Sequence, residues 1–301
     1  MVEEFDFQII ANLLAGRGEA REKLEKLKKF LKDNGATFHT LEIIKPTPIS
    51  QIPKDGNIKI NKGIICLGGD GTVSETIGYV LSNGIDTPVA VIPTGTANII
   101  ATTLGLGLKK GSFDFLLRGG TKEIDIGRAE YLNEKDYFIL GLGLGFEENF
   151  LKITKEKLKG KLGIFSYVFA ALAELFSLKR IPIKIKADGT EININICSLT
   201  ILNLQPVILK LFPLFKNEKV KGDDGVLNIC HVEYKNFFHA LIGTLFFHIF
   251  GKKFGLVKEI SGKEFFLESP TPVGTQIDGE LRGGLPVRIS LNPKGSSFLV
   301  P

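Results

Sequence analysis

Two glycine-rich turns hold the residue types that could bind phosphate. The first follows an apolar run at 64–67 and reads Gly68-Gly69-Asp70-Gly71-Thr72. Its glycines permit positive φ angles and leave no side chain in a ligand's way. Apolar residues at 73, 77, 80 and 81 then have helical spacing. A strand, a glycine turn and a helix N-terminus form a phosphate site, because free backbone N–H groups and the positive end of the helix dipole converge there.

The same pattern returns at 88–104. Residues 88–92 predict a buried strand, the turn reads Pro93-Thr94-Gly95-Thr96-Ala97-Asn98, and 99–104 begin a helix. Loops at the carboxyl ends of neighbouring strands form the crevice in which doubly wound sheets bind ligands. One glycine turn alone often only ends a strand. Two in series, each with polar side chains at its mouth, favour a binding site.

The two turns, together with Glu75, resemble the diacylglycerol kinase catalytic domain of bacterial soluble lipid kinases. Sphingosine kinases and NAD kinases are similar at a greater distance. The first turn is shared with NAD kinases, whereas the Pro-x-Gly-Thr-x-Asn pattern of the second favours the lipid kinase branch. The resemblance implies an N-terminal doubly wound, Rossmann-like α/β domain and a C-terminal antiparallel β-sandwich domain. It also implies transfer of the γ-phosphate of ATP to a lipid hydroxyl, such as that of diacylglycerol, in the cleft between the domains.

The resemblance assigns ATP to one set of residues in the first domain. The set is Asn12, Gly68, Gly69, Asp70, Gly71, Thr72, Glu75, Gly95, Thr96 and Asn98. Asp70 would hold Mg²⁺ near the triphosphate and so take part in catalysis. Glu75 would lie beside the base or ribose, although an ordinary surface carboxylate is an equally good interpretation.

A second acidic turn resembles the family's Asp-Gly-Glu motif. It is the segment Asp278-Gly279-Glu280, which follows a stretch rich in proline and glycine. The resemblance makes Asp278 the general base for the acceptor hydroxyl, with Glu280 as a helper at the nucleotide or metal. The alternative is an ordinary hairpin, because Asp-Gly is a common pair in type I′ turns.

A third acidic point is Asp224, which precedes Gly225. Members of the family carry a metal site at the matching turn. The resemblance makes the Asp224 carboxylate a ligand of Mg²⁺ or Ca²⁺, together with the backbone carbonyls of Lys221 and Val226. Oxygen ligands suit these hard cations, and such a site would support structure more than chemistry.

The chain departs from the family pattern at two places. Ile99 stands where the family has an aspartate after the asparagine of the second turn, and the apolar run 206–215 follows Asn203 where the family has a glycine-rich segment. Two alternatives therefore stay open. One is a kinase for a soluble acceptor such as NAD, and the other is a nucleotide- or lipid-binding homologue that has lost catalysis.

Composition narrows the class of protein. A chain of 301 residues is long enough for two domains, and a net charge of +5 is too mild to argue for nucleic acid. The three cysteines have no metal-binding spacing and predict neither zinc nor disulfides. Acidic residues at the N-terminus disfavour a signal peptide, and the apolar run 237–250 is too short to span a bilayer. We expect a cytoplasmic protein that meets its lipid substrate at the membrane surface, and a homodimer is compatible with the sequence.

These motifs require two kinds of domain. Strands at 6–11 and 37–44, a helix at 19–34 and an irregular connector at 45–59 complete the first domain, which we expect to end near Lys122. Residues 123–301 would form the lipid acceptor domain. Its predicted strands are 137–140, 181–186, 192–196, 227–232, 265–267 and 287–291. The helical segments 150–178 and 236–254 fit either lipid contact or a core helix.

Overall fold

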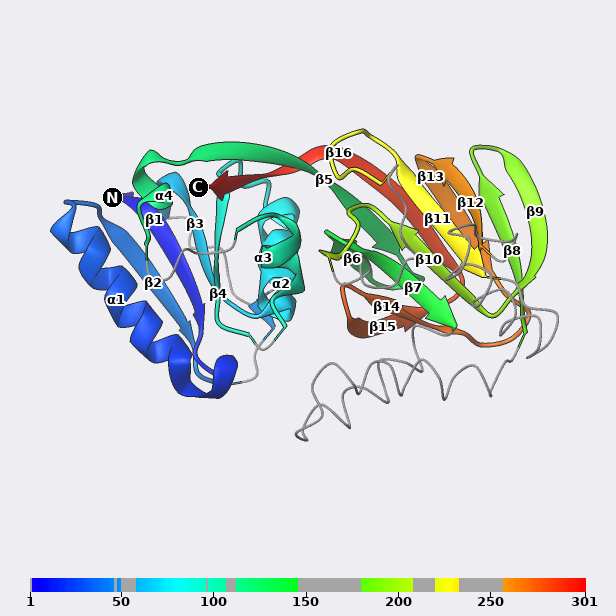
Figure 1. Cartoon of the computed structure of the whole chain (residues 1–301), viewed down its shortest axis with the longest axis horizontal. Helices are drawn as coiled ribbons and strands as arrows, with labels where there is room; N and C mark the ends of the chain where they lie inside the picture. Colours follow the sequence, from blue (N-terminus) through cyan, green and yellow to red (C-terminus); the bar gives the residue numbers. More distant parts are fainter. Residues whose placement is uncertain are drawn as a thin grey trace, which may run out of the picture. The chain divides into compact units, whose positions relative to one another are not determined.

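A computed structural model describes residues 2–45, 48–49, 58–95, 97–106, 112–145, 180–207, 220–232 and 257–301. These residues form two compact units (Figure 1). Unit 1 comprises Met1–Asp125 with Pro293–Pro301, and unit 2 comprises Ile126–Asn292.

Unit 1 is built on a parallel sheet in the order β2-β1-β3-β4. The strands are β1 (Glu3–Asn12), β2 (Phe38–Ile43), β3 (Ile58–Gly68) and β4 (Val89–Pro93). The helices are η1 (Gly16–Gly18), α1 (Glu19–Asp33), α2 (Asp70–Ser82), α3 (Ile99–Thr103) and α4 (Phe115–Arg118). Figure 1 shows α1 on one side of the sheet and α2 and α3 on the other. Helices on both faces of a parallel sheet confirm the doubly wound prediction.

Helix α1 follows from its apolar spacing. Ala20, Leu24, Leu27 and Leu31 are buried at intervals of three or four residues against alternate residues of the strands. The helix ends before Gly35, whose φ of +70° is left-handed. The opposite face of the sheet receives α2, where the Thr76 hydroxyl lies 3.4 Å from the Cys66 sulfur. Burial there raises the pKa of the Cys66 thiol to about 12.

Unit 2 contains two sheets. The first is antiparallel, with the order β12-β11-β10-β7-β14-β15. Its strands are β12 (Val257–Gly262), β11 (Leu227–Val232), β10 (Ser198–Leu202), β7 (Gly141–Gly145), β14 (Gly274–Ile277) and β15 (Glu280–Gly284). The second pairs β13 (Glu264–Glu268), β8 (Ile181–Ala187) and β9 (Thr190–Ile196) with the start of β16 (Val287–Val300), and also includes β6 (Lys135–Phe138) and the end of β5 (Gly120–Glu130). One core draws buried residues from both sheets, which confirms the predicted β-sandwich.

Two strands, β5 and β16, continue from one unit into the other. The boundary between the units falls within β5, between Asp125 and Ile126, close to the boundary predicted near Lys122. The C-terminal residues 293–301 belong to unit 1, because β16 extends beyond its pairing with β13 and Phe298 pairs in parallel with Val89 of β4. The sequence-based boundaries assign these residues to the second domain, 123–301.

Several sequence-based expectations fall outside the described residues. They concern Thr96, the helical segments 150–178 and 236–254, and most of the apolar run 206–215. Within the described ranges, no helix combines the length and the apolar character needed to cross a membrane.

Candidate active site

Three loops of unit 1 pack together at the carboxyl edge of the parallel sheet. They are 12–18 after β1, 68–72 after β3 and 93–98 after β4. A Cβ atom added to Gly16 would lie 1.7 Å from the carbonyl oxygen of Thr94, and one added to Gly95 would lie 2.7 Å from the Cα of Gly69. The loops therefore meet backbone to backbone, which only glycine permits.

Asn12 and Thr72 join the first two loops. The Asn12 Nδ2 donates a hydrogen bond to the Thr72 Oγ1 at 3.0 Å, and the Asn12 Oδ1 accepts one from the Leu14 amide at 3.0 Å. Both residues were predicted to contact the nucleotide, and the structure brings them into direct contact. Their side chains fix where β1 ends relative to the first turn of α2.

Asp70 joins the other pair of loops. It is the first residue of α2, and its carboxylate accepts hydrogen bonds from the amides of Ile99 at 3.0 Å and Ile100 at 2.8 Å. These amides open α3, so Asp70 supplies the negative charge that a helix N-terminus favours. Ile99 donates its backbone amide to the Asp70 carboxylate. The family pattern has an aspartate at this position, and Ile99 provides no such carboxylate.

Asn98 closes the third loop on itself. Its φ of +48° is left-handed, its Oδ1 accepts a hydrogen bond from the Gly95 amide at 2.9 Å, and its Nδ2 donates to the Gly95 carbonyl at 2.7 Å. The Thr94 amide also donates to the Gly68 carbonyl at 2.9 Å. The Thr94 hydroxyl oxygen is buried and has no hydrogen-bond partner among the residues that the structure describes.

The N-termini of α2 and α3 differ in their capping. Asp70 serves α3, whereas the N-cap of α2 is Gly69, which provides no side-chain cap. A helix N-terminus without a side-chain acceptor is suited to bind an anion. The phosphates of a nucleotide therefore fit the start of α2, and the glycines at 68, 69 and 71 allow close approach.

Asp70 is also suited to hold Mg²⁺. Its carboxylate oxygens, which accept hydrogen bonds from the amides of Ile99 and Ile100, are the kind of ligand that Mg²⁺ prefers. The described residues contain no group of three or more His, Cys, Asp or Glu side chains that could hold a metal ion. Proteins commonly bind Mg²⁺ through one or two carboxylates and the substrate's phosphates, so a single aspartate at this place fits a nucleotide-borne ion.

Glu75 lies further along α2 and faces the connector after β2. Its Oε2 accepts a hydrogen bond from the amide of Ile49 at 3.1 Å, and Ile49 is buried. The structure thus gives Glu75 a part in fixing this connector. Its predicted place beside the base or ribose stays a prediction.

Asp278 occupies a tight turn in unit 2. Asp278 and Gly279 have φ angles of +47° and +90°, and they join β14 to β15. These positive angles fit the type I′ hairpin that the Asp-Gly pair favours. The carboxylate accepts hydrogen bonds from three successive amides, those of Ile139 at 2.9 Å, Leu140 at 2.8 Å and Gly141 at 3.0 Å. Asp278 therefore fastens this hairpin to the connection between β6 and β7, and its role as general base stays a prediction.

Removing the Asp278 carboxylate should destabilise unit 2. Asp278→Ala leaves three backbone amides without their acceptor, and we expect a loss of about 2–4 kcal/mol in the free energy of unfolding. Urea denaturation measures the loss. Asp223→Ala, at an exposed turn position, is the control and should change stability by less than about 0.5 kcal/mol. Equal stability of the two variants would show that the carboxylate does not hold the hairpin.

A polar cluster supports the same hairpin. The Tyr131 hydroxyl lies 2.8 Å from the Thr275 Oγ1, and a Cβ added to Gly283 would lie 2.6 Å from the Tyr131 ring. Burial raises the pKa of Tyr131 to about 12. Glu280, the predicted helper, begins β15 and is half-buried. The predicted catalytic pair is thus carried on a hairpin that side-chain packing holds in place.

Asp136 should make stability depend on pH. Burial raises the pKa of its carboxyl above the ordinary 3.8, Arg282 opposes the shift and Glu134 adds to it. The folded state then binds this proton more tightly than the unfolded chain, so the stabilising contribution is complete below pH 3.8 and is lost as the pH rises through the raised value. We expect Asp136→Asn to raise the melting temperature at pH 7 and to have less effect near pH 4. Thermal unfolding across this range, with exposed Asp33→Asn as control, would refute the assignment if both variants behaved alike.

Asp224 lies in the turn before β11. Its Oδ1 accepts a hydrogen bond from the Val226 amide at 3.1 Å, and the Lys221 carbonyl accepts one from the Asp223 amide at 2.8 Å. Gly225 has a φ of +73°. The predicted ligands thus belong to one exposed turn, and metal binding there stays a prediction.

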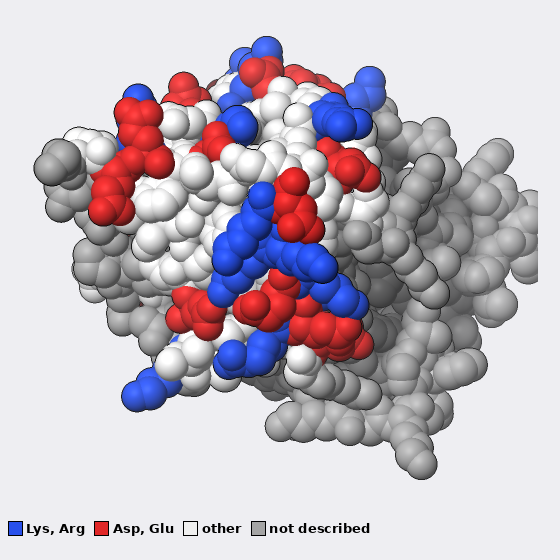
Figure 2. Space-filling view, turned by 90° about the vertical axis from the view of Figure 1, so that its left-hand side faces the viewer, with Lys and Arg blue, Asp and Glu red and all other residues white. Residues whose placement is uncertain are grey.

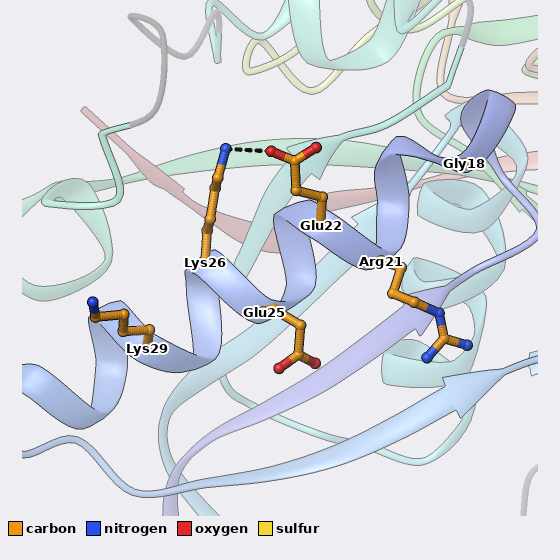
Figure 3. A pocket seen from close by; sticks show the side chains of 6 residues that line it. All are labelled: Gly18, Arg21, Glu22, Glu25, Lys26 and Lys29. Carbon is orange, nitrogen blue, oxygen red and sulfur yellow. Dashed lines mark hydrogen bonds and ion pairs between the residues drawn. The ribbon is translucent and has the colours of Figure 1, made fainter.

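The outer face of α1 carries a groove of about 610 Å³, which meets the three loops only at Gly18. It is lined by Gly18, Arg21, Glu22, Glu25, Lys26 and Lys29 (Figure 3). Lys26 and Glu22 form an ion pair at 2.6 Å. Figure 2 shows basic and acidic side chains interspersed over this side of the molecule. Charges of both signs on one helix face are typical of a solvated surface.

The sequence analysis does not identify one residue that lies near the loops. The Lys23 Nζ donates a hydrogen bond to the carbonyl oxygen of Pro93 at 2.9 Å and lies 3.7 Å from the Glu19 carboxylate. The periodicity of α1 places Lys23 on its polar face, together with several other lysines. No sequence signal separates it from them, because the contact depends on where β4 ends.

Comparison with known proteins gives consistent results. A model of the diacylglycerol kinase catalytic domain matches residues 6–129. A Staphylococcus carnosus protein named "Putative lipid kinase" is 30% identical over 230 residues, covering 75% of this chain and 72% of that protein. A diacylglycerol kinase of Mycobacterium tuberculosis is 29% identical over 244 residues, covering 79% and 76%. The crystal structure of a diacylglycerol kinase from Bacillus anthracis matches with a TM-score of 0.73 at 20% identity, covers 99% of this chain and 98% of its own, and shows the shared fold.

Proposed function

Since the chain belongs to the diacylglycerol kinase catalytic-domain family and is a lipid kinase of that type, we propose that it transfers the γ-phosphate of ATP to a hydroxyl of diacylglycerol or a related lipid. The observation that carries this proposal is the arrangement of the three loops. Asp70 caps α3, whereas the start of α2 has no side-chain cap and is lined by glycines. This arrangement is suited to the phosphates of a nucleotide.

The binding residues have distinct roles in the proposal. The amides at the start of α2 bind the phosphates, and Asn12 and Thr72 orient the first loop against them. Asp70 would hold Mg²⁺, which would neutralise charge on the phosphates. The same carboxylate fixes the amides of Ile99 and Ile100, so one side chain would serve both the metal and the 93–98 loop.

We assign the base that deprotonates the acceptor hydroxyl to the Asp278 hairpin. In the proposed reaction a base takes the proton of the lipid hydroxyl, the hydroxyl oxygen forms a bond to the γ-phosphorus, and the bond from that phosphorus to the β–γ bridging oxygen breaks to release ADP. Asp278 or its neighbour Glu280 is the base. Glu280 is the alternative base, because three backbone amides already bind the Asp278 carboxylate.

One observation favours a second candidate. Ile99 places an aliphatic side chain where the family has an acid, and loss of that acid would suit a protein that binds ATP or lipid without catalysis. A soluble acceptor such as NAD is the other alternative, and the first turn is its only support.

Acceptor-dependent release of ADP separates these functions. The purified chain is incubated with Mg²⁺-ATP and with diacylglycerol in mixed micelles, with NAD, or with neither. Release of ADP only with diacylglycerol supports the proposal, whereas release only with NAD replaces it. ATP binding without ADP release under any condition supports the homologue that has lost catalysis.

A further inference from the structure

We propose that Lys23 of α1 binds the nucleotide's phosphates and supplies the positive charge of the phosphate site. The proposal rests on the proposed function, since it adds a ligand to the same site. It assigns a role to a helix residue outside the three loops, which the sequence motifs do not include.

The three loops contribute few basic side chains to the phosphate site. Segments 68–72 and 93–98 contain no lysine or arginine, and 12–18 contains only Arg17. The side chain of Asp70 adds a negative charge at the same edge. A triphosphate brings further negative charge, so a basic side chain close to these loops would strengthen its binding.

Lys23 is already fastened to one of the loops. Its Nζ donates to the carbonyl oxygen of Pro93 at 2.9 Å, and the adjacent Thr94 amide donates to Gly68 at 2.9 Å. Gly16 packs against the Thr94 carbonyl from the loop that leads into α1. The ammonium group therefore lies at the base of the 93–98 loop in a defined position, which lowers the entropy lost when a ligand binds.

With respect to the residues that the structure describes, the ammonium group has donors left for a phosphate. It carries three N–H groups, and the hydrogen bond to Pro93 uses one of them. The Glu19 carboxylate is 3.7 Å away, which is an ion-pair distance rather than a hydrogen bond. The Lys23 side chain is 37% exposed and that of Glu19 is 72% exposed. A phosphate oxygen can thus reach Lys23, and water can solvate Glu19 when Lys23 turns to the ligand.

Lys23 differs in this respect from the other lysines of the helix. Lys26, one turn along, pairs with Glu22 at 2.6 Å on the outer face that Figure 3 shows. Lys28 pairs with Glu42 of β2 at 2.9 Å. Of the α1 lysines, Lys23 is the one with a described hydrogen bond to a loop of the site.

The test compares Lys23→Met with Lys26→Met in the full chain. Methionine keeps most of the length of the side chain and the helix propensity while removing the charge. Calorimetry measures the dissociation constants of Mg²⁺-ATP, ADP and adenosine, and thermal unfolding checks the fold. We expect Lys23→Met to weaken binding of ATP and ADP by about 10- to 100-fold and that of adenosine by less than about 3-fold, as removal of a charged hydrogen bond predicts. Lys26→Met should bind all three as wild type does, and Lys23→Arg should restore most of the affinity for ATP.

The failures are distinguishable. If the wild-type chain binds no Mg²⁺-ATP, the proposed function fails and this proposal fails with it. If the wild type binds ATP and Lys23→Met binds it equally well, only the role of Lys23 is overturned. If Lys23→Met weakens adenosine as much as ATP while the melting temperature falls, Lys23 supports the loop and does not contact phosphate.

Discussion

Asp70→Asn is expected to lower the rate constant of phosphoryl transfer by about 100- to 1,000-fold, the size of effect seen when one preorganised electrostatic group is removed from an active site. The asparagine keeps the shape of the side chain but loses its charge and one of its two acceptor oxygens. It could then neither hold Mg²⁺ well nor accept the hydrogen bonds of both Ile99 and Ile100. Steady-state kinetics with saturating ATP and diacylglycerol measures the loss.

The control separates catalysis from folding. Loss of one helix cap should reduce the free energy of unfolding by only about 1–2 kcal/mol, so Asp70→Asn should remain folded at 25 °C. Asp86→Asn, an exposed change between α2 and β4, should leave both rate and stability unchanged. A folded Asp70→Asn variant with wild-type turnover would rule out the proposed metal-binding role.

Gly16→Ala is expected to reduce the free energy of unfolding by about 2–5 kcal/mol and to abolish ATP binding. Two effects add. A left-handed backbone costs a residue with a Cβ atom about 1–2 kcal/mol, and overpacking adds about 1–3 kcal/mol. Both apply here, because Gly16 has a φ of +61° and its Cβ would overlap the Thr94 carbonyl oxygen. Chemical denaturation and calorimetry with Mg²⁺-ATP measure the two losses.

Gly35→Ala isolates the first effect, the cost of the left-handed backbone, because it adds no overpacking. Gly35 also has a left-handed φ, of +70°, but a Cβ there would meet nothing within 4 Å. It lies at the other end of α1, so this variant should lose about 1–2 kcal/mol of stability and should bind ATP normally. Similar behaviour of Gly16→Ala and Gly35→Ala would mean that the loops do not depend on their close contact.

The sequence was informative where a pattern is local. The spacing of Leu24, Leu27 and Leu31 predicted α1 to within a residue, and the glycine turns at 68–72 and 93–98 placed the starts of α2 and α3. The alternation of apolar and polar residues predicted β8 and β9. Such signals depend on the period of one element and need no knowledge of its partners.

Features that depend on distant pairing were not predicted. The strand β7 reads Gly-Leu-Gly-Leu-Gly, and glycine is uncommon in strands, yet its neighbours β10 and β14 provide the pairing. The return of β16 to unit 1 depends on Val89, which lies some two hundred positions earlier in the chain.

The candidate site shows the same limit. Its residues were named from motifs, but their contacts could not be. Asp70 was expected to serve a metal, and its role in capping α3 depends on the approach of two loops. The three amides that bind Asp278 come from residues 139–141, and the predicted strand 137–140 gave no sign that its end would bind a carboxylate. Lys23 was indistinguishable from its neighbours until the end of β4 was placed beside it.

The most direct test is transfer of labelled γ-phosphate from Mg²⁺-ATP to lipids in mixed micelles, followed by thin-layer chromatography. A labelled spot that requires diacylglycerol or a related lipid, and that disappears with Asp70→Asn, is the predicted result. A blank plate from protein that binds ATP and has the stability expected of the folded chain would contradict lipid phosphorylation.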